Sequence, residues 1–237
     1  MARNVENATF LGMDISRHRP KPFLEFLSPD QIALLQSAGR RRTLSDGQFI
    51  HSRGDGEPGI SVIEKGAAKA GIYGPDGGFI LTSFIGAGHS FGEFTVFTDL
   101  PLSHDISAVG PTTLINIPAK VFLKLCDREP AFLSALLRAT LLRSHVLIEM
   151  LHALRLLALV PRVAKYLLIM APLNGVNAKL RFRQSDLAAT LGLSRASMNR
   201  ALAELESLKL VRRYYGHIEI CSAAALSVWL EKTVGDD

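Results

Sequence analysis

Apolar residues between positions 184 and 206 recur with the spacing of two short amphipathic helices. At about 100° per residue, one side of each helix is apolar, and its positions are Leu187, Ala188, Leu191, Met198, Ala201, Leu202 and Leu205. Gly192 separates the two segments, and glycine tolerates the positive φ at which helices commonly end. Ser194 stands where its hydroxyl can cap the second helix. The pattern predicts a helix-turn-helix.

A different pattern occupies residues 23–125. Short apolar runs alternate there with glycine clusters, and the runs are Gln48–His51, Gly59–Ile63, Ala67–Tyr73 and Phe79–Ile85. The dipeptide Asp76-Gly77 between the last two runs is a strong hairpin signal. Regular short strands with Gly-Asp turns indicate a β-sandwich or roll.

After Pro130 the apolar spacing becomes helical as far as about residue 158. Two series with seven-residue spacing, offset by four, run along this helix: Leu133, Thr140, Leu147 and Leu154, and Leu137, Ser144, Leu151 and Ala158. Interleaved series of this kind make a coiled-coil seam and predict a homodimer. The alternative is packing of the helix against the chain's own roll. Pro161 is predicted to break the helix and to mark a hinge.

These elements divide the 237 residues into four parts. We expect a flexible arm at 1–22, a β-roll at 23–125, a dimerisation helix at 126–160 and a winged helix-turn-helix domain at 161–237. The fold class is therefore α+β. With 48% apolar residues, the chain can bury one core in each of two domains.

Composition narrows the location of the protein. Two cysteines, Cys126 and Cys221, give neither a disulfide framework nor metal-ligand spacing, which favours a reducing, cytoplasmic compartment. The first twenty residues lack the apolar core of a signal peptide. No run of about 18 uncharged apolar residues occurs, so no membrane span is expected.

Charge is unevenly distributed along the chain. Residues 1–154 hold 15 Lys and Arg against 15 Asp and Glu, whereas residues 155–237 hold 12 against 7. The whole net charge of +5 therefore belongs to the last third of the chain. A basic module on a neutral body is typical of a domain that binds the phosphates of nucleic acid.

The second helix of the predicted helix-turn-helix would present polar side chains to DNA. Opposite its apolar side lie Arg195, Asn199 and Arg200, with Ser197 as a further candidate for base contact. An arginine paired with guanine O6 and N7 discriminates between bases by roughly 1–3 kcal/mol. The candidates for phosphate contact are the cap and the flanking cations, namely Ser194, Lys179, Arg181, Arg183, Arg212 and Arg213. The last two begin a predicted hairpin wing. The alternative interpretation is a solvated helix pair beside an edge strand guarded by charge.

A roll, a long helix and a helix-turn-helix in this order resemble the cyclic-AMP receptor protein and FNR family of bacterial transcription regulators. The most specific matching segments are Leu193–Leu205, Gly88–Phe94 and Pro161–Leu168. The resemblance implies a cyclic-nucleotide-binding-like roll (a jelly roll), a homodimer, a near-palindromic operator on double-stranded DNA and RNA polymerase as a partner. It places the family's base-reading arginines on Arg195 and Arg200. Ala196 stands where the receptor has a glutamate, which implies a different operator.

The same resemblance locates an effector pocket that departs from the cyclic-AMP pattern twice. The Gly-Glu pair that holds ribose in the receptor is kept as Gly92 and Glu93. The arginine that binds the phosphate is absent from the corresponding segment, which contains Ser103 and His104 instead. The Thr-Ser pair that holds adenine is replaced by Leu147 and Ile148. A buried phosphate without a cation and a base edge without partners both cost free energy. We therefore expect that cyclic AMP does not bind tightly.

Other cofactors of the family fit no better, and the effector stays unidentified. An iron–sulfur cluster needs about four thiolates, which two cysteines cannot supply within one chain. Haem would have to draw on lone histidines, namely His51, His89, His104, His145 and His152. No P-loop, Gly-x-Ser-x-Gly elbow or catalytic carboxylate pair stands out, so an enzyme is not expected. The alternative to a DNA-reading regulator is a ligand-binding module that acts through protein partners.

Overall fold

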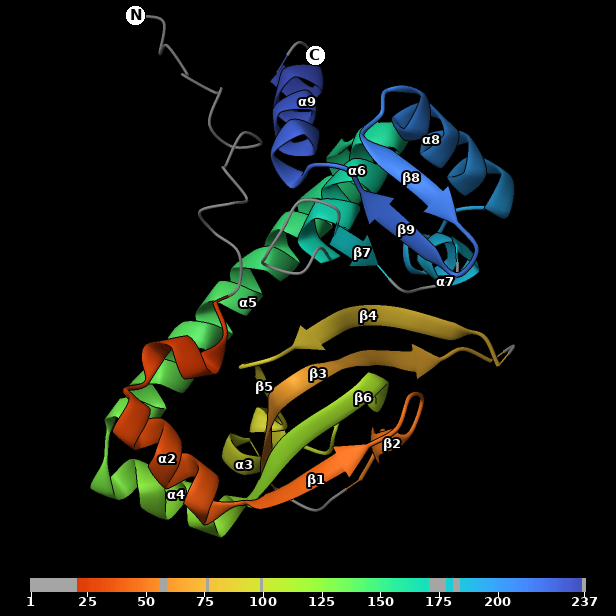
Figure 1. Cartoon of the computed structure of the whole chain (residues 1–237). Helices are drawn as coiled ribbons and strands as arrows, with labels where there is room; N and C mark the ends of the chain where they lie inside the picture. Colours follow the sequence, from red (N-terminus) through yellow and green to blue (C-terminus); the bar gives the residue numbers. More distant parts are fainter. Residues whose placement is uncertain are drawn as a thin grey trace, which may run out of the picture. The chain divides into compact units, whose positions relative to one another are not determined.

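The structure is a computed structural model in which residues 21–55, 59–75, 77–98, 100–170, 178–180 and 184–235 are described. Two compact units, Pro20–Leu142 and Arg143–Asp237, divide the chain, and their boundary lies within the long helix α5 (Ala131–Leu156). Figure 1 follows the chain from one unit to the other. Of the predicted arm, residues 1–22, only the last two residues are described.

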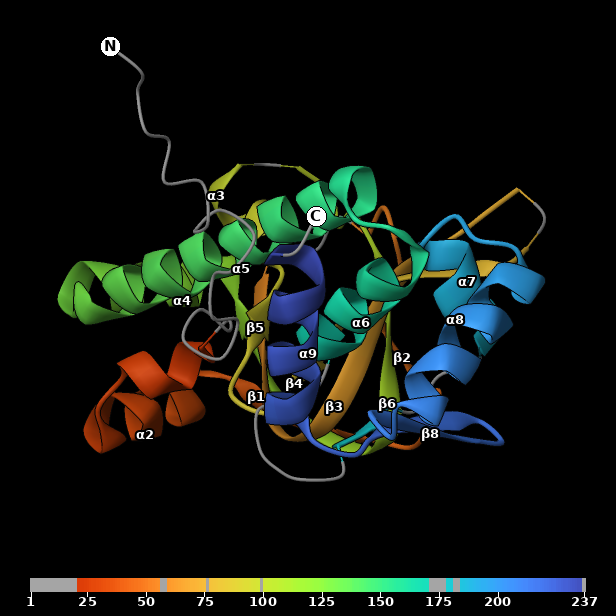
Figure 2. The ribbon, with the colours of Figure 1, turned by 90° about the horizontal axis from the view of Figure 1, so that it is seen from above.

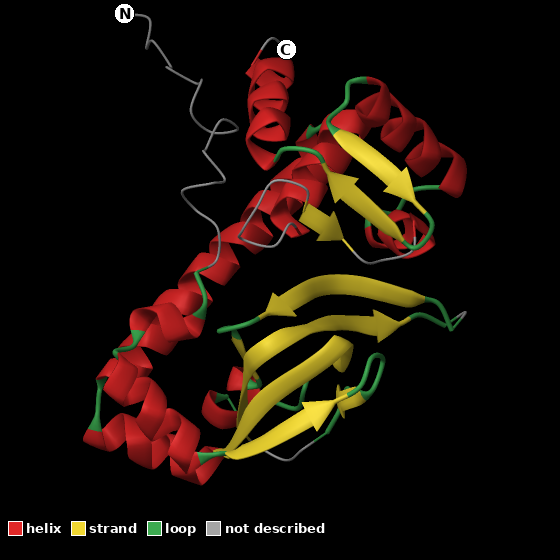
Figure 3. Ribbon diagram, in the orientation of Figure 1, coloured by secondary structure: helices red, strands yellow, loops and turns green. Residues whose placement is uncertain are grey.

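The first unit is built on a six-stranded antiparallel sheet, drawn in yellow in Figure 3. Its path runs β1-β6-β3-β4, with β2 paired to β6 and β5 paired to β3. The strands are β1 (Arg40–Leu44), β2 (Phe49–His51), β3 (Gly59–Tyr73), β4 (Phe79–Gly86), β5 (Ser90–Phe91) and β6 (Asp105–Pro118). The predicted strand-rich roll is confirmed, and β3 and β4 form the predicted hairpin. Asp76 of the predicted turn lies outside the described residues.

One prediction for this sheet is wrong. The runs Gly59–Ile63 and Ala67–Tyr73 belong to the single strand β3 rather than to two strands. Gly66 adopts φ +84° at the register shift between Lys65 and Ala67, and β3 pairs with β6 on both sides of it. A glycine inside a strand can mark a bulge rather than a turn, because it accepts a backbone conformation that bends the strand without ending it.

Short helices complete the roll. They are η2 (Phe23–Phe26), α2 (Pro29–Ala38), α3 (Glu93–Phe97) and α4 (Ala119–Arg128). Helix α2 begins with a capping box between Ser28 and Gln31. Phe23, Phe122 and Phe132 are fully buried in one core cluster, which joins η2, α2, α4 and the N-terminal half of α5 to the sheet. The predicted dimerisation helix, 126–160, therefore includes the last residues of α4 as well as α5.

Helix α5 presents two faces. Phe132, Ala135 and Leu136 are buried in the core cluster of the roll. The predicted seam is on an adjacent face: Leu133, Leu137, Ser144, Leu147, Leu151 and Leu154 are exposed, and Thr140 is partly exposed. Packing against the chain's own roll therefore accounts for one face of the helix and leaves the apolar seam open.

By length and composition alone, α5 could cross a membrane, since an 18-residue window has mean hydropathy 1.4. The expectation of no span rested on uncharged runs, whereas this helix carries Arg138 and Arg143. One such helix is weak evidence for a membrane protein, and here 22% of the window is buried inside the protein. A helix with one face in a core and one apolar seam reaches the same hydropathy without a bilayer.

The sequence predicted that Pro161 breaks the long helix, and this prediction is wrong. Helix α5 ends at Leu156 and α6 (Leu159–Met170) begins two residues before the proline. Pro161 thus lies in the first turn of α6, where a missing N–H leaves no hydrogen bond unmade. The junction is closed instead by Arg162, whose Nη2 and Nε donate to the carbonyl of Leu157 at 2.8 and 3.2 Å.

The second unit combines helices with a three-stranded antiparallel sheet of order β7-β9-β8. Its further elements are β7 (Ala178–Leu180), α7 (Gln184–Thr190), α8 (Arg195–Ser207), β8 (Val211–Tyr214), β9 (His217–Ile220) and α9 (Ala223–Gly235). Helix α6 packs against both α8 and α9, and Figures 1 and 2 agree in placing α9 beside α6. Helix α9 buries Leu226 and Leu230 and carries Trp229, the single tryptophan of the chain.

Candidate nucleic-acid interface

Helices α7 and α8 form the predicted helix-turn-helix. Gly192 adopts φ +63° in the turn, and the N–H of Leu193 donates to the carbonyl of Ala188 at 2.8 Å. The hydroxyl of Ser194 accepts from the N–H of Ser197 at 3.1 Å, which is the predicted N-cap. All seven predicted apolar positions are buried: Leu187, Ala188, Leu191, Met198, Ala201, Leu202 and Leu205. The motif is confirmed because its cap, its turn and its core agree.

The outer face of α8 is polar and open. Arg195, Asn199 and Arg200 are exposed, together with the small residues Ala196 and Ala203. Within the described part of the chain, no acidic side chain forms an ion pair with Arg195 or Arg200. Both guanidinium groups therefore keep the paired donors that recognise guanine or phosphate.

Ser197 differs from the other candidates for base contact. It is only partly exposed, and its hydroxyl accepts from the hydroxyl of Ser194 at 3.0 Å. Ser194 and Ser197 together close the first turn of α8, where free backbone N–H groups favour a phosphate oxygen.

Strands β8 and β9 form a hairpin wing directly after α8. Gly216 adopts φ +77° in the turn, and the neighbouring side chain of Tyr215 is fully exposed. The rings of Tyr214 and His217 stack at 4.6 Å with 3° between their planes. The predicted hairpin is confirmed, and its tip presents aromatic rings to solvent.

The two arginines of the wing differ in what they contact. Arg212 is largely exposed and has Nη1 at 3.7 Å from Oε1 of Glu219. Arg213 is held by Glu206 of α8, with Nη2 and Nε at 2.7 and 2.8 Å from Oε2 and its backbone N–H at 2.9 Å from Oε1. The sequence did not point to Glu206, because its partner lies beyond the end of the helix. Of the other predicted phosphate contacts, Lys179 belongs to β7 but its side chain lies outside the described residues, as do Arg181 and Arg183.

These contacts shift the titration of Glu206. The N–H of Arg213, followed by its guanidinium, lowers the pKa of the Glu206 carboxyl below its ordinary value, against the opposing effect of burial. The carboxylate is therefore the form that ties β8 to the end of α8.

The predicted effector segment begins at Gly92 in the first unit. Gly92 adopts φ +96°, and a Cβ atom there would collide with the carbonyl oxygen of Gly59. Thr95 holds the backbones of Gly92 and Gly59 together. Its hydroxyl donates to the carbonyl of Gly92 at 2.8 Å and accepts from the N–H of Gly59 at 3.1 Å. Glu93 accepts from the hydroxyl of the buried Ser90 at 2.6 Å. Glycine is required at position 92, and the carboxylate beside it is held in place.

The second part of the segment is polar and carries no lysine or arginine. The hydroxyl of Ser103 and Nδ1 of His104 lie 2.7 Å apart. Burial lowers the pKa of the His104 imidazole, and the positive charge of Arg53 lowers it further, against the effect of Asp105. Arg53 is exposed and comes from the loop after β2, so its position beside His104 could not be foreseen from the spacing of the segment. The imidazole is a neutral hydrogen-bonding group at neutral pH.

The two remaining effector candidates lie on α5. Leu147 and Ile148 are 50% and 51% exposed, and neither can satisfy a polar base edge. Among the described residues, no group of three or more His, Cys, Asp or Glu side chains is arranged to hold a metal ion.

Comparison with known proteins decides the family. The model of the "Cyclic nucleotide-binding domain" matches residues 41–129, and the model of the "Crp-like helix-turn-helix domain" matches residues 161–229. The chain belongs to the CRP/FNR family. This CRP/FNR protein is thus a DNA-binding transcription regulator with an effector-binding domain, and it is not an enzyme, since regulators of the family are non-enzymatic.

Individual relatives agree with this assignment. The regulator is 27% identical over 208 residues to the cyclic AMP receptor protein of Thermus thermophilus, an alignment that covers 86% of this chain and 94% of the relative. It is 27% identical over 158 residues to the CRP-like cAMP-activated global transcriptional regulator of Mycobacterium tuberculosis, covering 63% and 70% of the two chains. The solved structure of a candidate cyclic nucleotide binding protein from Ruegeria pomeroyi superposes with a TM-score of 0.62 at 25% identity, covering 93% and 97%.

Proposed function

We propose that this CRP/FNR regulator is a homodimer whose two α8 helices read the half-sites of a near-palindromic operator. Arg195 and Arg200 are the base-reading arginines, with Asn199 and Ser197 as further contacts in the major groove. The observation that carries the proposal is the exposure of both arginines, without an acidic partner among the described residues, on a helix whose opposite side is buried. Small residues between them let the helix approach the bases closely.

Phosphate contacts position the helix in this proposal. Ser194 and the N-terminal turn of α8 bind one phosphate, and Arg212 of the wing binds another. Arg213 has a smaller role, because Glu206 already holds its guanidinium. Lys179, Arg181 and Arg183 are further candidates for phosphate contact.

The dimer forms through α5. Its exposed seam leaves five large apolar side chains in water, namely Leu133, Leu137, Leu147, Leu151 and Leu154. A second copy that covers this seam removes them from water, and the two-fold symmetry of such a dimer matches paired half-sites. Residues 23–125 would then sense the effector, 126–160 join the copies, and 161–237 bind DNA.

The candidates for effector contact are Gly92, Glu93, Ser103 and His104 in the roll, and Leu147 and Ile148 on α5. We expect cyclic AMP to bind weakly, because the segment with Ser103 and His104 carries no arginine for a cyclic phosphate and two aliphatic side chains stand where adenine needs hydrogen bonds. The names of the relatives bear on those proteins and leave the ligand of this one open. A cytoplasmic location and RNA polymerase as the partner follow from the same proposal.

Replacement of the reading arginines tests the proposal. An operator is first selected from random-sequence duplexes with the wild-type protein. Arg195→Ala and Arg200→Ala should each lower affinity for that operator by about ten- to a hundredfold, because each removes a paired base contact. Fluorescence anisotropy measures the affinity, and sedimentation velocity checks that the dimer persists. Unchanged operator affinity in both variants would refute the assigned reading face.

Two comparisons sharpen this experiment. Lys232→Ala removes one exposed positive charge from α9, outside the proposed interface, and should leave operator affinity within about twofold of wild type. Titrations at rising salt should show a steep fall of affinity, since phosphate neutralisation releases counterions. A flat salt dependence would instead favour a module that acts through protein partners.

A further inference from the structure

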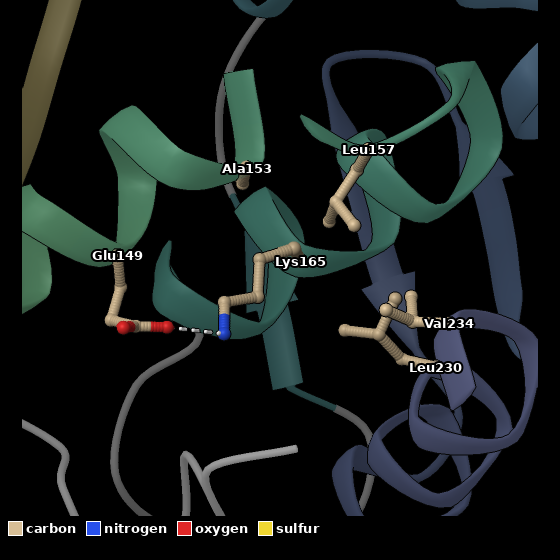
Figure 4. A pocket seen from close by; sticks show the side chains of 6 residues that line it. All are labelled: Glu149, Ala153, Leu157, Lys165, Leu230 and Val234. Atoms are coloured by element: carbon tan, nitrogen blue, oxygen red, sulfur yellow. Dashed lines mark hydrogen bonds and ion pairs between the residues drawn. The ribbon is translucent and has the colours of Figure 1, made fainter. Parts of the chain in front are cut away.

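An ion pair is buried at the junction between α5 and α6. Nζ of Lys165 lies 3.0 Å from Oε2 of Glu149, and the two side chains are only 5% and 12% exposed. Figure 4 shows the lysine of α6 extended along its own helix to meet the carboxylate of α5. Within the described part of the chain, Lys165 forms no other ion pair.

Apolar side chains line the space around Lys165, while Nδ1 of His152 lies 3.9 Å from the other carboxylate oxygen of Glu149. Ala153 of α5 and Leu157 of the junction lie on one side, and Leu230 and Val234 of α9 close the other (Figure 4). The space left between them is no larger than about one water molecule needs. The site is therefore too small for a ligand and excludes most of the solvent that would otherwise solvate the two charges.

A buried ion pair fixes a geometry more than it adds stability. Taking both charges out of water costs about as much as their attraction returns, and apolar replacements of similar volume are often equally stable. Apolar contacts tolerate small rotations of one helix on another, whereas an ammonium that leaves its carboxylate here would face Leu157, Leu230 or Val234. The pair thus admits one register of α6 on α5.

The register of α6 also determines where α8 lies. Helix α6 packs against α8, and each helix carries a fully buried leucine, Leu167 in α6 and Leu202 in α8. Helix α9 also packs against α6, and its Leu230 and Val234 line the space beside Glu149 and Lys165. Rotation of α6 at the junction would therefore carry the recognition helix with it.

We propose that Glu149 and Lys165 are positioning residues that set the separation of the two recognition helices, and that α9 seals their ion pair. The inference rests on the proposed homodimer, in which α5 of each copy carries its own α6 and α8. A rigid junction makes the dimer selective for one distance between half-sites. A loose junction would let it bind several distances about equally.

The double variant Glu149→Met/Lys165→Met tests this assignment in the full-length protein. The probes are duplexes that carry two selected half-sites at the preferred spacing, or at spacings longer and shorter by one and two base pairs. We expect wild type to bind the preferred spacing at least about tenfold more tightly than the altered ones, and the variant to retain at most about threefold. The thermal midpoint of the variant should stay close to that of wild type, since methionine fills similar volume.

Each outcome of the binding series is decisive. The matched control Glu231→Met/Lys232→Met makes the same changes at exposed positions of α9 and should keep the wild-type preference. A folded Glu149→Met/Lys165→Met dimer with the wild-type preference would overturn the inference alone. A wild-type protein that shows no preference for spacing would overturn the proposed dimer and this inference together.

A second measurement needs no variant. Amide hydrogen exchange in wild type should protect Leu226–Val234 of α9 about as strongly as Val163–Leu168 of α6, because both belong to one sealed junction. Exchange of the α9 amides at least about a hundredfold faster than those of α6 would show that α9 does not seal the ion pair, whatever the folding of the double variant.

Discussion

At the scale of single residues, the function of an arginine in this regulator depends on which acid lies beside it. Arg195 and Arg200 are exposed without acidic partners among the described residues. The guanidinium and the backbone N–H of Arg213, in contrast, both donate hydrogen bonds to Glu206. Their positions in the sequence identified all three as DNA-contact candidates. In the structure, Arg195 and Arg200 stay open to solvent, whereas Arg213 holds the wing to α8.

The Glu206 carboxylate makes the stability of this contact dependent on pH. Because Arg213 lowers the pKa of Glu206 in the folded state, the contact stabilises the protein above the unfolded pKa of about 4.3 and is lost as pH falls through the lower folded value. Wild type should therefore lose thermal midpoint more steeply than Glu206→Gln between about pH 5 and pH 3. At pH 7 the variant should be less stable by at most about 1 kcal/mol, since the pair is partly exposed.

Thermal unfolding followed by circular dichroism across this pH range measures the difference. Glu204→Gln is the matched control, because Glu204 is exposed on the same helix and no ion pair involves it among the described residues. Parallel pH profiles for wild type and Glu206→Gln would contradict the assigned contact.

At the scale of elements, α5 combines an intramolecular face with an open one. Ala135 and Leu136 are buried in the roll, and Leu137 directly after them is 57% exposed. A heptad pattern by itself does not distinguish a seam between two copies from a face that packs on the same chain. Here the two faces are adjacent around the helix, since successive residues are about 100° apart, and packing on the roll leaves the seam positions exposed.

Charges placed on the open face of α5 should dissociate the proposed dimer. Leu137→Lys/Leu151→Lys puts two cations on each copy at positions where the copies would meet, and like charges at a seam repel while the leucine contacts are lost. We expect the dimer dissociation constant to rise at least about tenfold in sedimentation equilibrium. Leu156→Lys, on the same helix but outside both series, should leave it within about twofold. Equal effects of both changes would argue against this seam.

The extent to which elements could be predicted follows from how local their determinants are. The helix-turn-helix was predictable to the residue, because Gly192, Ser194 and the apolar spacing all act within a few positions of one another. The unity of β3 was not, since a glycine such as Gly66 permits a bulge or a turn and only pairing with β6 decides. Pro161 misled for the same reason, because proline ends a helix from inside yet is well tolerated in a first turn.

At the scale of the whole molecule, charge and chemistry are divided between the two ends of the chain. The excess of positive charge lies in residues 155–237, together with the recognition helix, and residues 1–154 are neutral. The effector candidates are split between the roll and α5. Composition was sufficient to predict which part of the chain binds DNA. The surroundings of His104 could not be predicted, because they include Arg53 from a loop about fifty residues earlier in the sequence, and no spacing rule indicates that contact.

Cyclic AMP should bind weakly to this regulator. In the proposed effector site, the segment with Ser103 and His104 carries no arginine for a cyclic phosphate, and Leu147 and Ile148 have no polar group for adenine. Isothermal titration calorimetry should show no binding with a dissociation constant below about 100 µM. The cyclic AMP receptor protein of Thermus thermophilus serves as the positive comparison. Micromolar affinity would contradict the expectation and would point to Arg53 as the group that replaces the missing arginine.

Helix α9 has one more consequence, for how this protein can be observed. Trp229 is the only tryptophan in the chain and stands, partly exposed, next to Leu230, which covers the Lys165 side chain. Tryptophan fluorescence therefore comes from a single side chain, on the helix α9 that packs at the junction. Detachment of α9 would move that ring into water. A shift in the wavelength of tryptophan fluorescence would therefore follow the detachment in real time, without an added dye.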